Sequence, residues 1–438
     1  MVSLAQSFFS LKKNILFAIV LLAGLCFLVI QLRLGTDHIQ RVPSVTSTTK
    51  TLSAEKIVAE RLSKSLNHLA AIPVRDGDIL KADNISSYTD AIFLHREAKI
   101  DTFQCPLVNE TRYADLTKSP GPTNPKIRYF FALNLRENLG LLPRLIGSIV
   151  DAIRFLGPEY CVLSILEGNS PDGTADVLNA IRPHLESLGI RYYLDSSTID
   201  PKKTERIQAL ADLRNLALKP LIVNSADASK DTTIVFLNDV AACSDSILEL
   251  VLQRRNLGAD LVCGMDWNLD PPRFYDIWIA RTIKGDDFID VPDGRWEEIT
   301  DLFWNDDYVM SRYKAFRPFQ VFSCWNGGAV FGAQSTLEGL RFRAAKQGEC
   351  YQGEPQIFCK EMWYKGFGKI AVVPSVNYEY TIEAGRRINK WKGFVSDIVS
   401  QQDPADDKIE WQLTPPAQVK CIGGWGNTTW GPWDEALP

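Results

Sequence analysis

Short apolar runs alternate with stretches of helical periodicity between residues 127 and 250, and this alternation constrains the fold more than any other feature. The apolar runs predict strands at 128–133, 161–166, 190–193 and 234–237. Helical patterns separate them at 139–156, 174–188 and 206–218. Because strands that alternate with helices pair in parallel, the sequence predicts an α/β domain with a mostly parallel central sheet.

The strand at 234–237 ends in Asn238-Asp239, and a helix follows. Open α/β sheets place ligands at the carboxyl ends of their strands, so Asp239 is a candidate metal ligand and catalytic residue. A divalent cation bound by hard oxygen atoms can neutralise a diphosphate and assist its departure. Ser246 and Glu249 have capping-box spacing, which predicts that the helix begins at Ser246. Asn-Asp after a strand is also ordinary turn chemistry, so the motif alone leaves both interpretations open.

The loop after the second strand is rich in polar residues and glycine. It contains Glu167, Asn169 and Asp172, which could bind the base and ribose of a nucleotide, with glycines letting the backbone approach. A tight polar turn before a helix is the alternative.

The helical segment 206–218 carries three charged residues that could face a nucleotide. Arg206 or Arg214 could clamp a phosphate, and Asp212 could bind an arginine or a ribose. A solvated helix face is the alternative. The Asn238-Asp239 motif, the loop after the second strand and the segment 206–218 occupy corresponding ends of successive elements. Together they therefore favour a nucleotide site more strongly than any one of them does alone.

The second half of the chain has the composition of a sugar-binding surface. All eleven tryptophans lie between Trp267 and Trp433, and exposed indole faces can stack on sugar rings, although most are expected in the core. Two aromatic segments, 274–281 and 324–328, supply the candidate acceptor-binding residues, which are Asp276, Arg281, Trp325 and Asn326.

Two further carboxylates are candidates for assisting the reaction. Glu354 precedes Pro355 at the expected start of a helix, from which it could hold an acceptor hydroxyl. Its alternative role is a helix-start acid that interacts with the helix dipole. Asp266 could assist instead of Glu354, and the sequence does not choose between them.

Composition excludes several classes of protein. The 438 residues are 45% hydrophobic and 23% charged, as in a globular protein. A formal charge of -5 and a pI of about 5.6 argue against a general nucleic-acid binder. Four histidines and the lack of a CxxC pair make a zinc site improbable.

The N-terminus predicts a membrane anchor. Residues 15–30 are apolar apart from Gly24, with Lys12 and Lys13 before them and Arg33 after them. This pattern predicts a cytosolic tail at 1–14, a signal anchor at 15–33 and a lumenal remainder, in a type II topology of the Golgi or another secretory membrane. A cleaved signal peptide is the rival interpretation, but no small-residue cleavage site is obvious.

Residues 34–100 are predicted to form a stem and neck, with Val58, Leu62, Leu66 and Leu69 on one helical face. The lumenal domain is then expected at 101–438. It divides into a nucleotide-binding half at about 126–245, an acceptor half at about 246–385 and a C-terminal extension at 386–438.

Other features agree with a lumenal placement. Asn84, Asn109 and Asn427 begin glycosylation sequons. Cys26 lies in the predicted span, which leaves eight lumenal cysteines. Some of these are expected to form disulfides and others to be small core residues, and the pairing stays open.

Five runs together resemble one family. They are ILEGNSPDGT, RIQALADLRNLAL, IVFLNDV, VFSCWNGGAVF and GECYQGEPQIFCKEMW. Their order over about residues 126–383 resembles the fungal capsule-associated mannosyltransferases, glycosyltransferase family 69. The resemblance implies a Golgi type II enzyme with a GT-A-like nucleotide-sugar transferase fold, acting in capsule or cell-wall glycan synthesis. It further implies GDP-mannose as donor, a divalent metal such as Mn2+, a mannoside or polysaccharide acceptor and a retained, α-1,3 linkage.

The resemblance also assigns Asn238-Asp239 to the family's metal motif, which in this chain lacks the first Asp of a full DxD. The last histidine is His184, so no late histidine is available as a further metal ligand. This departure keeps open a non-catalytic lumenal factor for polysaccharide assembly or export. A glycoside hydrolase, which also uses two carboxylates, fits a nucleotide-type fold less well.

Overall fold

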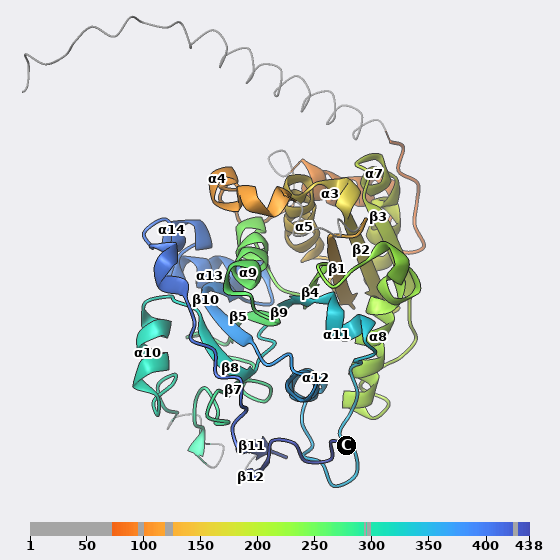
Figure 1. Ribbon diagram of the computed structural model, residues 1–438. Helices are drawn as coiled ribbons and strands as arrows, with labels where there is room; N and C mark the ends of the chain where they lie inside the picture. The colour runs from red at the N-terminus through yellow and green to blue at the C-terminus, as the bar shows by residue number, and fades with distance from the viewer. Residues whose placement is uncertain (1–71, 95–99, 119–125, 293–294, 296–298, 424–427) are drawn as a thin grey trace, which may run out of the picture. The chain divides into compact units, whose positions relative to one another are not determined.

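The computed structural model describes residues 72–94, 100–118, 126–292, 295, 299–423 and 428–438 (Figure 1). Within these ranges, no helix is both long and apolar enough to cross a bilayer. The predicted tail and anchor at 1–33 and the predicted helical face at 58–69 lie outside the described residues, so both stay predictions.

A ten-stranded sheet forms the centre of the molecule, in the order β3-β2-β1-β4-β9-β5-β10-β8-β7, with β6 paired to β5. The strands are β1 (Tyr129–Leu135), β2 (Cys161–Glu167), β3 (Arg191–Ser196), β4 (Thr233–Leu237), β5 (Leu261–Asn268), β6 (Arg273–Phe274), β7 (Arg281–Thr282), β8 (Phe319–Ser323), β9 (Gly328–Gly332) and β10 (Ile370–Tyr378). A separate two-stranded sheet pairs β11 (Gln418–Ile422) with β12 (Thr428–Pro432).

Most strands of the large sheet run in the same direction. β1 pairs in parallel with β2 and β4, and β2 pairs in parallel with β3. β9 is antiparallel to both β4 and β5, whereas β5 and β10 are parallel to each other. β1 to β5 and β10 therefore share one direction, and β8 and β9 oppose it. The predicted α/β architecture with a mostly parallel sheet is confirmed.

Helices cover both faces of this sheet (Figure 1). Their bounds are α3 (Ala82–Phe93), α4 (Glu110–Tyr113), α5 (Leu142–Leu156), α6 (Thr174–Ala180), α7 (Arg182–Ser187), α8 (Arg206–Val223), α9 (Ser244–Leu257), α10 (Asp307–Lys314), α11 (Ala333–Leu337), α12 (Glu354–Tyr364), α13 (Ile382–Lys392) and α14 (Val395–Val399). Side chains of β1 alternate between two cores. Phe131 and Leu133 pack with α5 and α9, whereas Phe130 and Ala132 pack with α8 and α12.

The four strands predicted in the first half are present, and their helices differ in two places. The predicted helix 174–188 is divided into α6 and α7, because Pro183 lies in the first turn of α7 and breaks the hydrogen-bond ladder. The predicted start at Ser246 is wrong, since α9 begins at Ser244 with Cys243 as its N-cap. The Glu249 carboxylate does not complete a capping box but binds Arg112.

Part of the segment predicted as stem and neck packs against the core. α3 buries Ile85, Ile92 and Phe93 against the first core. The chain before α3 is bound by Asp176, whose carboxylate accepts the backbone N–H groups of residues 78, 79 and 80 at 3.0, 2.8 and 2.7 Å. A buried carboxylate with several backbone donors is strongly stabilised, so residues 76–93 belong structurally to the folded body.

Three disulfides join distant parts of the chain: Cys105–Cys243, Cys263–Cys324 and Cys350–Cys421. Cys161 and Cys359 are buried free thiols. The predicted mixture of disulfide and core cysteines is therefore present among the described residues. Structural disulfides of this number are typical of proteins that fold in an oxidising compartment.

The sequons occupy exposed positions where they are described. Asn84 lies on the first turn of α3, and the side chain of Asn109 caps α4 by accepting the Arg112 N–H at 3.0 Å. Asn427 lies outside the described residues. Glycosylation at all three positions stays a prediction.

The Arg112–Glu249 ion pair provides a test of the fold. The guanidinium binds the carboxylate at two distances of 2.7 Å, and the Glu249 side chain has no exposed surface. Arg112→Ala leaves this carboxylate buried with only neutral donors, so we expect the free energy of unfolding to fall by about 3–5 kcal/mol. Denaturant unfolding of the variant measures this loss.

Arg386→Ala is the matched control, because Arg386 pairs with Asp101 and both side chains are largely exposed. The free energy of unfolding should be nearly unchanged in that variant. Equal losses in the two variants would contradict the assignment of Arg112 as the partner of a buried charge.

Candidate functional site

The carboxyl ends of β1, β4, β5 and β10 meet the loop between β8 and β9 and together form the candidate site. Asn138 follows β1, and Asn238-Asp239 follows β4. Asp266 lies near the end of β5, and Tyr380 follows β10. This is the edge at which open α/β sheets bind ligands.

Gly327 allows the β8–β9 loop to lie against the end of β4. Its carbonyl accepts the Asn238 N–H at 3.0 Å, and its φ of +79° is in the left-handed region. A Cβ at this position would lie 3.2 Å from both the Asp266 Cβ and the Val240 Cγ1. A glycine therefore satisfies both the backbone conformation and the close approach.

Asp239 has the environment of a cation ligand. Its Oδ2 accepts a hydrogen bond from the Asn138 amide at 3.2 Å. Burial raises the pKa of the Asp239 carboxyl, while the Asn138 hydrogen bond and the Arg214 charge oppose that shift. A carboxylate in such surroundings is stabilised by a cation that binds directly to it.

Asn238, the residue before Asp239, has a side chain that contacts two neighbouring elements. Its Oδ1 accepts from the Trp325 indole at 3.0 Å and from the Arg214 guanidinium at 3.4 Å. The side chain thus joins the loop before β9 to α8. Asn238 positions these neighbours, and Asp239 is left as the motif's carboxylate.

Arg214 and Glu354 form a mostly buried ion pair at the centre of the site. The Arg214 Nε donates to the Glu354 Oε1 at 2.7 Å, and the side chains are 11% and 3% exposed. The guanidinium also lies over the Trp325 ring at 4.5 Å and the Phe236 ring at 5.2 Å. These contacts fix its orientation.

Glu354 is both the first residue of α12 and the partner of Arg214. An acid at a helix start interacts favourably with the helix dipole, as in the alternative interpretation, and the acceptor contact of Glu354 stays a prediction. Its hydrogen bond to Arg214 brings α12 and α8 together beside Asn238.

Asp266 and Asp276 are acidic groups held close together. Asp276 accepts the Asn326 N–H at 2.8 Å, and Asp266 accepts the Tyr380 hydroxyl. Burial raises the pKa of Asp276 to about 6. Burial and repulsion by Asp276 raise the pKa of Asp266, and its Oδ1 has no hydrogen-bond partner in the described part of the chain.

The structure thus brings together seven of the predicted site residues: Asp239, Arg214, Glu354, Asp266, Asp276, Trp325 and Asn326. Trp325 and Asn326 are buried, so they support the site from below. Asn326 adopts a φ of +50°, and its amide donates to the Gly264 carbonyl at 2.9 Å.

The loop after β2 uses its polar groups largely to bind itself. Glu167 accepts the N–H groups of Asn169 and Ser170 at 2.8 and 2.9 Å. Asp172 accepts from the Thr174 N–H at 3.0 Å and the Leu139 N–H at 3.1 Å. Asn169 is exposed. These contacts agree with the alternative interpretation of the loop as a tight polar turn. A nucleotide contact by Glu167, Asn169 and Asp172 stays a prediction.

The other two predicted residues of α8 lie toward its exposed start. Arg206 is exposed at the first position of the helix, and Asp212 accepts from the Gln208 amide at 2.8 Å. Only Arg214 of the three lies against Asn238. The predicted nucleotide contacts of Arg206 and Asp212 are not tested by this geometry.

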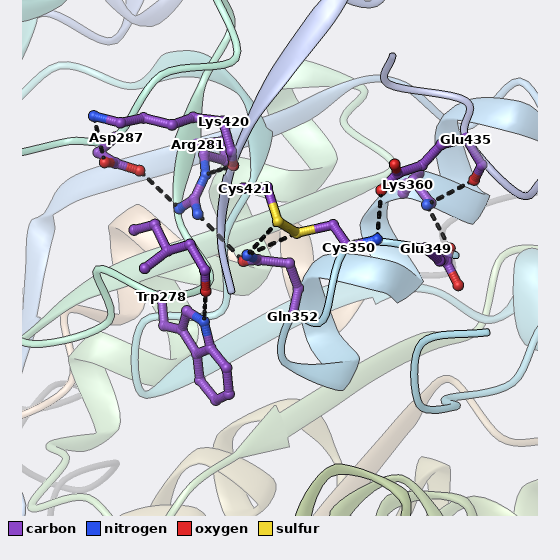
Figure 2. The surroundings of a disulfide bond; sticks show 11 residues. Trp278, Arg281, Asp287, Glu349, Cys350, Gln352, Lys360, Lys420, Cys421 and Glu435 are labelled. Carbon is purple, nitrogen blue, oxygen red and sulfur yellow. Dashed lines mark hydrogen bonds and ion pairs between the residues drawn. A yellow bond between two sulfur atoms is a disulfide. The ribbon is translucent and has the colours of Figure 1, made fainter. Parts of the chain in front are cut away.

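Arg281 lies beneath the site and is fully buried. Its guanidinium donates to the carbonyls of Ile277 and Ala280. It also donates to the Lys420 carbonyl and pairs with Asp287 at 3.1 Å (Figure 2). With every described contact inside the protein, Arg281 joins β11 to β7. An acceptor contact by its side chain stays a prediction.

Three residues of the site, Asn138, Tyr275 and Tyr380, were not identified from the sequence, nor was Tyr351, which lies near Glu354 in the chain. Asn138 and Tyr380 follow the ends of β1 and β10, so the rule that selected Asp239 could have found Asn138. Tyr275 precedes Asp276, and Tyr351 lies three residues before Glu354. Their proximity to the site depends on tertiary packing that periodicity does not report.

The metal-ligating groups of the site fit a divalent cation that needs few protein ligands. The described ranges contain no cluster of three His, Cys, Asp or Glu side chains able to hold a metal. Asp239 supplies one hard oxygen ligand, and Mg2+-like ions are commonly held by one or two carboxylates together with water and substrate phosphates. Asp239 is therefore compatible with a metal that the donor substrate helps to bind.

Known proteins provide an independent comparison. The family model described as cryptococcal mannosyltransferase 1 matches residues 128–361. An α-1,3-mannosyltransferase, CMT1 of Cryptococcus neoformans var. neoformans serotype D, is 34% identical over 391 residues, which cover 80% of this chain and 84% of that protein. The chain belongs to the cryptococcal mannosyltransferase 1 family. It is therefore a glycosyltransferase, and the predicted family is confirmed.

The matched region of this family contains Arg214, Asn238-Asp239, Trp325-Asn326 and Glu354. Tyr380 and the C-terminal segment that contacts Arg281 lie beyond it. Membership of the mannosyltransferase family favours an enzyme over the non-catalytic assembly factor.

Solved structures show more distant likenesses. TarS 1-349 of S. aureus in complex with UDP has 9% identity and a TM-score of 0.36, covering 63% of this chain and 67% of that chain. The mannosyltransferase PcManGT of Pyrobaculum calidifontis, in complex with GDP-Man and Mn2+, has 12% identity and a TM-score of 0.35, covering 74% and 77%. Likenesses this distant carry no functional conclusion.

The acidic pair predicts a pH dependence of stability. The folded state holds the pKa of Asp276 at about 6, above its ordinary value of 3.8, so it binds more protons than the unfolded state between these values. The contribution of Asp276 to stability is complete below about pH 4 and is lost as the pH rises through about 6. We expect a loss on the order of 2–3 kcal/mol across this window.

Asp276→Asn removes the titration and keeps an oxygen that can accept the Asn326 N–H. Urea unfolding of both proteins at several pH values between 4 and 7 should therefore show a smaller decrease in the variant. Identical pH profiles would contradict the raised pKa of Asp276.

Proposed function

We propose that this glycosyltransferase transfers mannose from GDP-mannose to a mannoside or polysaccharide acceptor, forming an α-1,3 linkage with retention of configuration. The observation that supports this most is the placement of Asp239 at the end of β4 beside the Arg214–Glu354 pair. The 34% identical relative named as an α-1,3-mannosyltransferase supports the sugar and the linkage. The catalytic domain is proposed to have a GT-A-like fold.

Donor binding is assigned to the β4 end and α8. Asp239 would hold a divalent metal, with Mn2+ proposed, and the charge of such an ion would neutralise the diphosphate. Arg214 is oriented by Glu354, Asn238 and Trp325, so its positive charge is preorganised beside the leaving group. Glu167, Asn169, Asp172, Arg206 and Asp212 are proposed to contact the nucleotide.

Acceptor binding is assigned to the carboxylates of the second half. Glu354, Asp266 and Asp276 can accept hydrogen bonds from sugar hydroxyls at the site. The acceptor oxygen forms a bond to the mannosyl C1 on the face from which the diphosphate oxygen departs. The hydroxyl proton passes to the departing diphosphate, so the step balances without a protein base.

We further propose that the enzyme is a type II protein of the Golgi or another secretory membrane and acts in capsule or cell-wall glycan synthesis. The apolar run at 15–30 and the flanking lysines support the anchor. Three disulfides support an oxidising lumen for the catalytic domain. The exposed sequons at Asn84 and Asn109 agree with that placement.

Asp239→Asn tests the proposal, because it removes the charge and keeps an oxygen for Asn138. We expect transfer from GDP-mannose to mannosides by the full chain to require Mn2+ or a similar ion and to fall at least about a hundredfold in the variant. The assay measures sugar transfer and donor hydrolysis over a panel of nucleotide sugars, with and without metal.

Asp115→Asn is the matched control, since Asp115 is an exposed carboxylate that pairs with Lys118 far from the β4 end in sequence. Its activity should equal that of the unsubstituted chain. Full activity of a folded Asp239→Asn protein would refute the metal assignment. Lack of turnover with every donor would instead favour the non-catalytic assembly factor.

A further inference from the structure

Tyr275, which adjoins the acidic pair of Asp266 and Asp276, and Tyr351, which lies three residues before Glu354, expose much of their surface, although most large aromatic side chains of the described residues are buried. Tyr275 is 51% exposed and Tyr351 is 43% exposed. Exposing an aromatic ring next to buried carboxylates has no evident benefit for folding. Such a combination of aromatic faces and hydrogen-bonding groups is typical of a ligand site.

Tyr275 is connected to the acidic pair through the backbone. Its N–H donates to the Asp266 carbonyl at 3.1 Å, and its ring lies 5.2 Å from that of Tyr380, which binds the Asp266 carboxylate. Burial and the charges of Asp266 and Asp276 raise the pKa of the Tyr275 phenol, and Arg206 opposes this shift. Tyr275 therefore borders the site on the side of β5.

Tyr351 lies on the other side, three residues before Glu354. Its hydroxyl donates to the Glu205 carboxylate at 2.8 Å, which joins the loop before α12 to the start of α8. The ring lies 6.0 Å from the partly exposed Trp278 ring. Trp278 is in turn three residues after Tyr275, so the three aromatic residues come from two neighbouring segments.

The C-terminal segment holds two of these rings in place. The Trp278 indole donates to the Ile422 carbonyl at 2.7 Å, and the disulfide Cys350–Cys421 fixes the residue beside Tyr351 (Figure 2). The Cys350 N–H also donates to Glu435 at 2.8 Å. These contacts come from β11 and from the residues after it, outside the segment that the family model matches.

We propose that the exposed faces of Tyr275, Trp278 and Tyr351 form a subsite that stacks on a pyranose ring of the acceptor, and that β11 positions this subsite through Cys421. A pyranose presents C–H groups on one face and hydroxyls at its edge. The aromatic faces pack against the C–H groups, and the carboxylates of Asp276 and Glu354 accept hydrogen bonds from the hydroxyls. This inference rests on the proposed sugar transfer.

Tyr351→Ala and Tyr351→Phe in the full chain test the stacking. The alanine variant should raise the KM for a mannoside acceptor about tenfold, since one lost contact of about 1.4 kcal/mol corresponds to that factor. Donor KM and donor hydrolysis should not change. The phenylalanine variant keeps the ring and loses only the hydrogen bond to Glu205, so it should retain most of the affinity for the acceptor.

A second pair of variants tests the positioning role of the disulfide. Cys421→Ser should raise acceptor KM in the same direction with little change in donor hydrolysis. Cys243→Ser removes a disulfide that joins the start of α9 to Cys105, and it should leave acceptor KM unchanged in the fraction that folds. Equal effects of the two variants on acceptor KM would overturn the positioning role.

Two other outcomes would overturn the subsite. Loss of acceptor affinity in Tyr351→Phe equal to that in Tyr351→Ala would show that the hydrogen bond, and not the ring, matters. A rise in donor KM instead of acceptor KM would assign the rings to the donor. If GDP-mannose is not turned over at all, direct binding of α-1,3-mannobiose by saturation-transfer NMR still decides the subsite, because the alanine variant should lose that binding.

Discussion

The antiparallel insertion of β9 between β4 and β5 is the constraint on which the rest of the structure depends. Backbone hydrogen bonds from β9 to both neighbours join the strands β1 to β4 to the later strands in one continuous sheet. The loop that enters β9 must then pass directly over the end of β4, where the Gly327 carbonyl accepts the Asn238 N–H. The site follows from this sheet order, because residues from both halves are brought to one edge.

The sheet edge formed by the carboxyl ends of the strands has a positively charged region and an acidic region. Arg214, held by Glu354 and the Trp325 ring, provides a fixed positive charge beside Asn238. The carboxyl groups of Asp266 and Asp276 form an acidic pair at the end of β5, and burial weakens their acidity. For the proposed transfer, a positively charged region would suit a departing diphosphate and an acidic region would suit hydroxyl groups, so the two substrates would prefer different positions.

Much of the first half could be predicted from sequence because its signals are local. The apolar runs at 128–133 and 234–237 are β1 and β4 almost to the residue, and the rule on strand ends selected Asp239. The start of α9 was missed because a disulfide at Cys243 and the binding of Arg112 to Glu249 outweighed the capping pattern. Contacts between residues far apart in the sequence leave no periodic pattern in it. The roles of Asn138 and Tyr351 were not predicted for the same reason.

The disulfide Cys263–Cys324 has a consequence for how the protein can be produced. It covalently joins β5, which contains Asp266, to the residue that precedes Trp325. The disulfide thus links β5 to the loop between β8 and β9, and its formation depends on the redox state of the compartment. A chain made in a reducing bacterial cytoplasm would lack this tie even where its hydrophobic core is correctly packed. Recombinant material can therefore look folded by secondary structure while its catalytic groups are loosely held, and a thiol count distinguishes the two preparations.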